Sequence, residues 1–597
     1  MNSTDTKLRH SWLAHRGGLV LAAVAIAVLT ILVHWPAVHN GFVYWDDPFY
    51  LRKASQLKRI SLPAIEWAAT ALLPLYYHPL TWLSHLLDFQ LWGWNPVGHH
   101  ASSVLLHGLN AGLVCLFVWM LTGTLGNLSN STRLTMAAGV AVAFGIHPLQ
   151  VESVAWVAER KTVLCGFFSL LCLCAYLRAV SVGAPACVAV ATSARRRPGG
   201  RALPTTTERR WWWVMTALFL SALLSKPMAV SLPLVMLVLD FYPLRRQMRW
   251  SWWALLKEKA VLYAYCVAFG VATIISQSRA GAVTNLAGFG ITARCVVAAR
   301  NVIFYIWKLI WPSWLSPYYP LEGEIPLGDP EFAFSVISVI FISVFAFWLR
   351  KRVPVVWSAW CAYLALIAPV SGLMQVGGQG AGDRFMYLAM IPVLLLVAAG
   401  CVWLWRDFSL NDRNALAPLR AGLAGLLGCL LLFYGFQTRG QITVWHDDET
   451  LWTAAVRCFP TSVLANWKLA QALMMQKRYE EALPYAQKAT RLNPTFGPMR
   501  ATLGEVCLRT HHDREAITEL QEALRLKPDM DDARYTLACV YSRLNRLDDA
   551  YRTLQELLAV EPSYARPAAT DEELANLRDS PEFSVRLRVL LGGVGAK

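Results

Sequence analysis

Long blocks of apolar residues restrict the possible folds of this chain more than any other feature. Gly18 to Val33, Phe385 to Trp405 and Leu419 to Phe436 each come close to the ~20 residues with which an α-helix crosses a bilayer. Hydrophobic residues fill 56% of the 597 positions and charged residues only 16%, which is not the composition of a soluble protein. Because hydrocarbon offers no partners to backbone N–H and C=O groups, we expect these blocks to be membrane-spanning helices.

Eleven blocks are long enough to be considered as spans, near residues 18–34, 101–122, 135–147, 162–180, 211–224, 227–243, 258–276, 332–349, 354–371, 385–405 and 418–437. Lys and Arg are enriched in cytoplasmic loops, so Lys7, Arg9 and Arg16 place the N-terminus in the cytoplasm. Eleven spans then put four arginine-rich segments on the same side, at 195–210, 245–249, 350–352 and 406–420. The net charge of +16 therefore reflects membrane topology, and nucleic acid is not an expected partner.

The stretch from Asn301 to Pro312 is apolar enough to be a twelfth span, but a twelfth span would move the basic segment 350–352 to the outside. We therefore expect a helix that lies in the outer membrane interface, where Trp and Tyr side chains are favoured. The first apolar block lacks a small-residue cleavage site, which favours an uncleaved first span. The thirteen cysteines lack the paired spacing of a zinc site or a disulfide framework, so we expect most of them to be small core residues.

A different periodicity begins after residue 440. Prolines recur every 34 residues, and so do small and apolar residues: Pro460, Pro494, Pro528 and Pro562, then Ala482, Ala516 and Ala550, then Leu469, Leu503 and Leu537. This period is typical of tetratricopeptide (TPR) repeats, in which each unit is a helix pair that Pro closes. We expect an all-α chain with a polytopic membrane helix bundle at 1–440 and a TPR α-solenoid at 441–597. Eleven spans after a cytoplasmic start place the solenoid outside.

Two adjacent carboxylates, Asp46 and Asp47, lie in the first predicted outward loop, within the aromatic sequence GFVYWDDPFY. A poorly hydrated carboxylate can act as a general base on an acceptor hydroxyl, because burial raises its pKa. An Asp-Asp-Pro turn or helix cap would place the same residues here without any chemistry. The local sequence leaves both interpretations open.

Ionisable side chains also gather in the second outward loop, GIHPLQVESVAWVAERK, where the candidates are His147, Glu152, Glu159, Arg160 and Lys161. Charges beside an apolar span are costly, which favours a polar cavity or an anion site, although an Arg-Lys pair can also simply anchor the next span. His147 has no partner histidine at metal-ligand spacing, so no zinc site is predicted. Outward carboxylates could still hold a divalent cation for phosphate chemistry.

Two further outward segments add cations, Lys226 in Ser225-Lys226-Pro227 and Arg384 at the start of the tenth span. Cations that converge from separate loops are what a phosphate ester requires. For either residue taken alone, anchoring of a helix at the interface is slightly favoured over contact with a ligand.

The segments FVYWDDPFY, HHASSVLLHGLNA, HPLQVESVAWVAERKTVL, LSKPMAVSLPLVMLVLDFYPL, WPSWLSPYYP and DRFMYL follow one another in this order and are followed by TPRs. In this order of elements, the chain resembles the transmembrane-and-TPR O-mannosyltransferase family of the GT-C glycosyltransferase superfamily. The resemblance implies that Asp46 is the base with Asp47 beside it. It further implies that Lys161, Lys226, Arg384 and Arg160 bind the phosphate of a lipid-linked sugar donor.

The expected activity is therefore transfer of a hexose, with mannose the expected sugar, from a polyprenyl phosphate to an acceptor hydroxyl, expected to be protein Ser or Thr. The reaction would occur on the outer face, with the TPRs in the periplasm of a bacterium or in the endoplasmic reticulum lumen of a eukaryote, and the TPRs would hold the acceptor polypeptide. A non-enzymatic TPR scaffold for envelope assembly is the main alternative. A transporter or flippase is disfavoured, because the ionisable residues lie in outward loops and not within spans.

Overall fold

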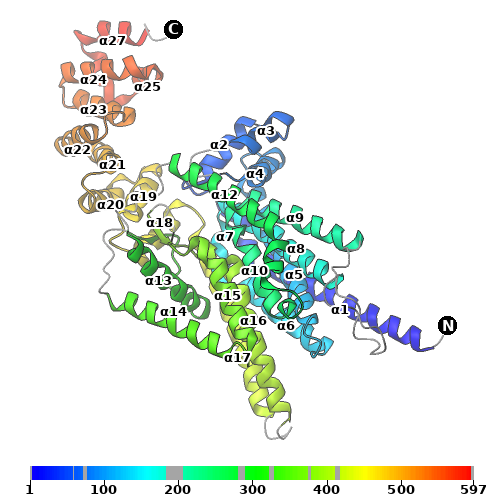
Figure 1. Cartoon of the computed structure of the whole chain (residues 1–597). Helices are drawn as coiled ribbons and strands as arrows, with labels where there is room; N and C mark the ends of the chain where they lie inside the picture. Colours follow the sequence, from blue (N-terminus) through cyan, green and yellow to red (C-terminus); the bar gives the residue numbers. More distant parts are fainter. Residues whose placement is uncertain are drawn as a thin grey trace. The chain divides into compact units, whose positions relative to one another are not determined.

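The computed structural model (Figure 1) describes residues 3–57, 59–71, 77–182, 206–279, 290–321, 329–373, 378–410 and 417–592. The basic segment expected at 195–210 lies mostly outside these residues, as does part of the segment at 406–420. The described chain is almost entirely helical, and its two short strands, β1 (Tyr319–Pro320) and β2 (Gln379–Ala381), form one antiparallel pair. The chain divides into two compact units, Met1–Asp447 and Asp448–Lys597. The predicted all-α fold class is confirmed.

Each of the eleven predicted spans coincides with a helix: α1 (Ser3–His34), α5 (Pro96–Gly123), α6 (Asn130–Ile146), α8 (Arg160–Val182), α9 (Thr206–Ser225), α10 (Leu232–Phe241), α12 (Ala260–Arg279), α14 (Pro330–Leu349), α15 (Pro354–Ile367), α16 (Met386–Leu410) and α17 (Ala417–Val444). Seven helical segments in the described part are long and apolar enough to cross a membrane alone. An eighth is added if α6 and the segment that follows it, bent by 56°, count as one span. The segments 227–241 and 354–370 are apolar but shorter. The protein is thus a multi-pass membrane protein.

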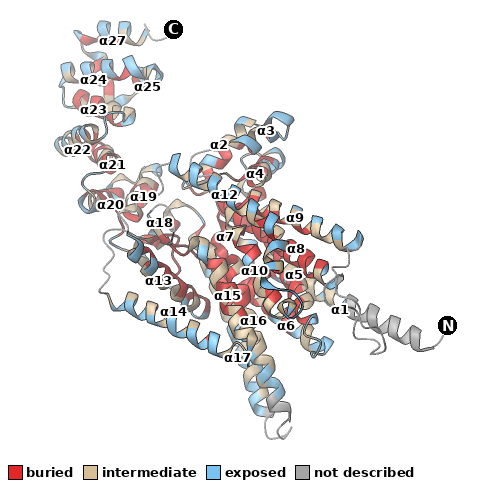
Figure 2. Ribbon diagram, viewed as in Figure 1, coloured by how far each residue is buried: buried red, intermediate tan, exposed pale blue. Residues whose placement is uncertain are grey.

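Burial in the first unit follows the position of each helix (Figure 2). Buried side chains concentrate on α5, α8 and α10, whereas α14 and α17 carry mostly intermediate and exposed residues. On α14, Phe334, Ile337 and Phe341 each expose about two thirds of their surface. Apolar faces of this extent are typical of helices that contact lipid.

Shorter helices lie between the long ones in the first unit: α2 (Asp47–Leu57), α3 (Leu62–Thr70), α4 (Pro79–Trp92), α7 (Val151–Ala155), α11 (Trp252–Glu258) and α13 (Ile291–Ile310). Helix α13 includes most of the stretch for which we expected an interfacial helix. One of its faces buries Val297, Asn301 and Tyr305, while Trp307 and Ile310 are exposed. The helix is therefore amphipathic, and its location at the interface stays a prediction.

The second unit begins with α18 (Asp448–Cys458) and continues as helix pairs at the predicted period: α19 (Val463–Met475), α20 (Tyr479–Leu492), α21 (Gly497–Arg509), α22 (Asp513–Leu526), α23 (Asp531–Arg543) and α24 (Leu547–Val560). The turns inside the three pairs have Lys477, His511 and Asn545 in the left-handed region, again 34 residues apart. A Cβ atom on Gly504 would lie 2.5 Å from Leu520, so the close helix approach requires glycine there. The last described helices are α25 (Ala565–Thr570), α26 (Ala575–Asp579) and α27 (Phe583–Gly592).

Candidate active site

The two aspartates of the first predicted outward loop have different environments. We keep the names first and second outward loop for the segments 41–50 and 145–161, whose orientation stays a prediction. Asp47 is fully buried, and its carboxylate accepts hydrogen bonds from the backbone N–H of Val43 at 2.9 Å and of Ala158 at 2.8 Å. Burial raises the pKa of Asp47 to about 7, although both hydrogen bonds oppose this shift. Asp47 thus joins the first outward loop to the second. For Asp47, this geometry favours the interpretation in which the aspartate has a structural role and no chemical one.

Asp46 precedes the first turn of α2, and its backbone carbonyl accepts the N–H of Phe49 at 3.1 Å. Its side chain is 23% exposed, and its Oδ2 atom lies 3.9 Å from the Nζ atom of Lys161. Of the two aspartates, Asp46 is thus the one whose carboxylate a substrate can reach. A partly exposed carboxylate beside an ammonium group has the access that a general base needs.

Three cations from separate segments meet at the buried carboxylate of Glu159. The Nζ atom of Lys161 lies 3.2 Å from Oε1 of Glu159, Nζ of Lys226 lies 3.0 Å from Oε2, and Nε of Arg384 lies 3.3 Å from Oε1. Lys161 lies in the first turn of α8, Lys226 lies between α9 and α10, and Arg384 precedes α16. We call these three side chains with Glu159 the Glu159 cluster. The structure therefore brings together three of the four predicted phosphate ligands.

A second glutamate holds Arg384. The Nη1 atom of Arg384 pairs with Oε1 of Glu152, and the backbone N–H of Arg384 donates to Oε2 of Glu152 at 2.8 Å. Glu152 and Glu159 partly neutralise these three cations. Among the five side chains, positive charges outnumber negative ones by one. Burial lowers the pKa of Lys226, and Glu159 opposes this shift by stabilising the ammonium form.

Arg160 and His147 lie outside this cluster. Arg160 is buried against Asp88, with 2.7 Å between Nη2 and Oδ2, and it donates to the carbonyl of His99 at 2.6 Å. One ring nitrogen of His147 lies 3.0 Å from the carbonyl oxygen of Leu309, and the other accepts the N–H of Leu149. Both side chains hold the second outward loop against neighbouring helices. We therefore leave them out of the proposed donor site.

Several residues near the cluster were not identified from the sequence. The hydroxyl of Thr162 donates to Glu159 and accepts from the Nζ atom of Lys226 at 2.6 Å. The buried His78 lies near Lys161 and Lys226, and burial lowers its pKa to about 3, so its imidazole is neutral. The ring of Trp156 lies 5.6 Å from the cationic groups of both Lys161 and Arg384. Thr162 and Trp156 are close in sequence to predicted residues, which is the signal that could have found them.

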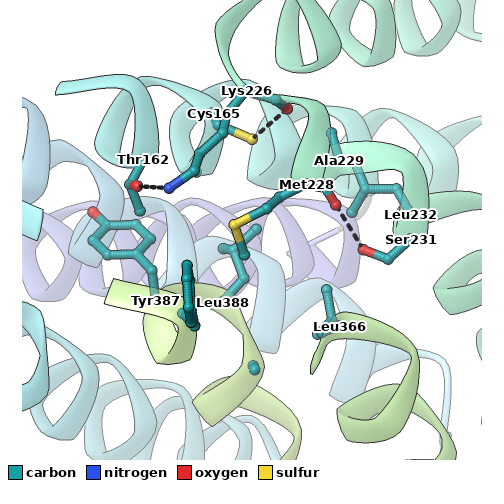
Figure 3. Close-up of a pocket in the computed structure, with 13 residues that line it drawn as sticks. Thr162, Cys165, Lys226, Met228, Ala229, Ser231, Leu232, Leu366, Tyr387 and Leu388 are labelled. Atoms are coloured by element: carbon teal, nitrogen blue, oxygen red, sulfur yellow. Dashed lines mark hydrogen bonds between the residues drawn. The ribbon is translucent and has the colours of Figure 1, made fainter. Parts of the chain in front are cut away.

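A small cavity adjoins the Glu159 cluster, and a larger cavity lies next to the small one. Figure 3 shows the small one, of about 20 Å³, with Lys226 and Thr162 at one side and Tyr387, Leu388 and Met228 nearby. The larger cavity of about 400 Å³ shares Leu232, Leu366 and Leu388 with it. The larger cavity is lined almost entirely by apolar side chains of α5, α6, α8, α10, α15 and α16.

The larger cavity is long. Its lining follows α16 from Leu388 to Arg406, which corresponds to about 27 Å of helix at 1.5 Å per residue. The hydrocarbon core of a bilayer is about 30 Å thick. The cavity is therefore suited to an extended hydrocarbon chain.

The described residues near the cluster do not form a binding site for a divalent cation. Within the described ranges, no three His, Cys, Asp or Glu side chains gather as metal ligands do. Glu152 and Glu159 contact Arg and Lys groups instead. We derive no step through a metal.

The TPR prediction is confirmed by comparison with known families, since tetratricopeptide repeat models match residues 463–496 and 514–570. Among solved structures, the crystal structure of MamA protein is 19% identical, with a TM-score of 0.22, and covers 24% of this chain and 77% of its own.

The predicted family resemblance is also confirmed. The human protein O-mannosyl-transferase TMTC1 is 24% identical over 472 residues, which are 72% of this chain and 49% of the human protein. Shorter matches have higher identity: 37% over 109 residues of human TMTC4, covering 17% of this chain and 15% of that protein, and 34% over 122 residues of Drosophila melanogaster Tmtc1, covering 20% and 13%. The chain thus spans about half the length of human TMTC1 and a smaller part of the others.

Proposed function

We propose that this protein is a membrane glycosyltransferase of the GT-C type that moves a hexose, mannose by analogy with its relatives, from a polyprenyl phosphate to a protein Ser or Thr hydroxyl. One observation carries the proposal: the Glu159 cluster lies beside Asp46, and its Lys226 lines the small cavity, which shares three lining residues with the long apolar cavity along α16. An amphiphile with an anionic phosphate and a long hydrocarbon chain matches this arrangement.

In the proposed step, the acceptor oxygen attacks the anomeric carbon of the donor sugar. The bond from that carbon to the phosphate oxygen breaks, and polyprenyl phosphate leaves with both bonding electrons. The acceptor proton passes to the carboxylate of Asp46, so that charge and atoms balance. Because attack and departure occur on opposite sides of the anomeric carbon, the configuration there inverts.

The leaving phosphate gains negative charge during this step. Lys161, Lys226 and Arg384 are suited to stabilise that charge, because they are largely buried and come from separate segments that hold them in place. A phosphate monoester is already a good leaving group, so cationic stabilisation matters more than general-acid assistance. Glu159 and Glu152 would keep the cations oriented before the donor binds.

The TPR unit is proposed to bind the acceptor polypeptide in an extended conformation, on the same outer side as Asp46. Relatives named protein O-mannosyl-transferases support a protein acceptor. The outer side would be a periplasm in a bacterium or the endoplasmic reticulum lumen in a eukaryote. In a non-enzymatic scaffold, by contrast, the TPRs would act alone and the carboxylate of Asp46 would be dispensable.

A transfer assay tests the proposal. The full chain, purified into lipid vesicles, is supplied with mannosyl polyprenyl phosphate and a Ser/Thr-rich peptide, and the peptide mass is measured. We expect an increase of one hexose with the lipid donor and none with a nucleotide sugar. Transfer from the nucleotide sugar alone would refute the donor assignment. Absence of transfer from polyprenyl phosphates carrying any common hexose, to peptide or glycolipid, would favour the scaffold.

A further inference from the structure

Three tryptophan rings form a continuous stack beside the proposed base. The rings of Trp45 and Trp156 are 4.8 Å apart with 23° between their planes, and those of Trp156 and Trp445 are 5.4 Å apart with 26°. Trp156 and Trp445 expose 2% and 0% of their surface. The stack joins the first outward loop, the second outward loop and the segment after α17. Trp45 directly precedes Asp46 in the chain.

Backbone and side-chain hydrogen bonds join the same segments. The N–H of Gly41 donates to the carbonyl of His446 at 2.8 Å, and the amide of Asn40 donates to the carbonyl of Ile442 at 3.2 Å. The segment 442–447, which we call the junction, therefore contacts the loop 40–47 directly at two points, and Trp445 reaches Trp45 of that loop through Trp156. Asp47 attaches the loop to the second outward loop through the N–H of Ala158 and also bonds to Val43 within the loop.

The junction is also the end of the first unit, because the second unit begins at Asp448. The chain thus leaves the membrane domain for the TPR solenoid directly after residues that support the loop of Asp46. The stack could simply fill space in the core. Space filling alone, however, does not explain why the stack connects the loop of the proposed base with the junction that precedes the TPR solenoid.

We propose that Trp445 is a positioning residue for Asp46. By stacking on Trp156, it holds Trp45 and so sets the position of the adjacent carboxylate. The junction consequently ties the attachment of the acceptor-binding solenoid to the geometry of the catalytic loop. This inference rests on the proposed glycosyl transfer, in which Asp46 is the base.

Misplacement of a catalytic group by about 1 Å can cost about 10²-fold in rate, so removal of this support has a measurable effect. We expect Trp445→Ala to lower kcat by about 10- to 100-fold and to change the KM for the lipid donor less, because the ring that lies against Lys161 and Arg384 is that of Trp156. Trp445→Phe keeps a flat ring that can stack on Trp156. It should restore most of kcat.

A matched control is Trp360→Ala. Trp360 is also buried, with 7% exposure, but it lies on α15 and bonds to Ser343 of α14. Loss of a buried indole there should destabilise the protein without a selective loss of kcat. If Trp445→Ala is too unstable to purify, Trp445→Leu takes its place in every comparison.

Hydrogen exchange gives a readout that does not depend on activity. In the full chain in lipid nanodiscs, Trp445→Ala should accelerate amide exchange within 41–50, and Trp360→Ala should not. The inference is overturned if exchange there is unchanged, or if the Trp445 variant loses no more kcat than the Trp360 variant. Failure of the proposed function is a separate result: the wild type then transfers no sugar, or Asp46→Asn transfers at the wild-type rate.

Discussion

The Nζ atom of Lys161 lies 3.9 Å from the Oδ2 atom of Asp46. The same atom is 3.2 Å from Glu159, which also binds Lys226 and Arg384. One ammonium group therefore connects the proposed base with the proposed phosphate ligands. An anomeric carbon held between them would have the acceptor hydroxyl on one side and the leaving phosphate on the other.

Asp46→Asn should abolish most activity without affecting insertion. Asn keeps the size of the side chain but cannot take up the acceptor proton, and general base catalysis contributes about 10²–10⁴-fold. The measurement is the rate of sugar transfer by wild-type and variant protein at equal amounts in vesicles. Near wild-type transfer by a correctly inserted Asp46→Asn variant would remove Asp46 from the mechanism.

Asp47→Asn should instead affect stability, with a definite dependence on pH. The pKa of Asp47 rises from 3.8 to about 7 on folding, so the folded state holds its proton more tightly than the unfolded state. This contribution to stability is fully present below about pH 4 and is lost as pH rises towards 7. Because Asn does not titrate, only the wild type loses this contribution. The melting temperature of the variant minus that of the wild type should therefore increase as pH rises from about 4 to about 7. A constant difference would contradict the raised pKa.

Lys226→Met and Arg160→Gln should have different effects. Lys226 belongs to the Glu159 cluster, so its loss should raise the KM for the lipid donor by about tenfold or more, given that hydrogen bonds to charged groups contribute about 1.5–3 kcal/mol. Arg160 pairs with buried Asp88, and breaking a buried pair costs about 3–5 kcal/mol of stability. The KM for the lipid donor and the thermal unfolding temperature, both measured on each variant, test these two predictions. A raised donor KM for a stable Arg160→Gln protein would return Arg160 to the donor site.

Ala362→Phe should reduce the use of long-chain donors. Ala362 is buried and lines the larger cavity, so a phenyl ring there would occupy space proposed for the polyprenyl chain. Donors with short chains should be used almost as well as by the wild type. Equal loss with both donors would show that the variant acts through packing and not through the chain.

A reporter fused after residue 597 should be active only outside the cytoplasm. Eleven spans after a cytoplasmic N-terminus place the C-terminus outside. Glycosylation or periplasmic alkaline phosphatase activity of the fusion is the measurement. Activity only in the cytoplasm would mean that the number of spans is even, as it would be if α13 crossed the membrane.

Local patterns in the sequence determined the helical fold class, the positions of the apolar helices and the TPR period. These features depend on neighbours within a few turns: an apolar block excludes water along its own length, and Pro or Ala at a repeated position acts within its own helix pair. The motif order was also enough to predict the family resemblance. None of these inferences required knowledge of which helices touch.

The tertiary structure alone decided what individual side chains of each motif do. Asp46 and Asp47 are adjacent, yet only Asp47 points into the interior, where the N–H of Ala158 lies more than a hundred residues away in sequence. Arg160 and Lys161 are also adjacent, but successive residues on a helix point about 100° apart, and one meets Asp88 while the other meets Glu159. Whether a charge is exposed, paired or poised for chemistry depends on distant segments that pack around it, and sequence spacing does not contain that information.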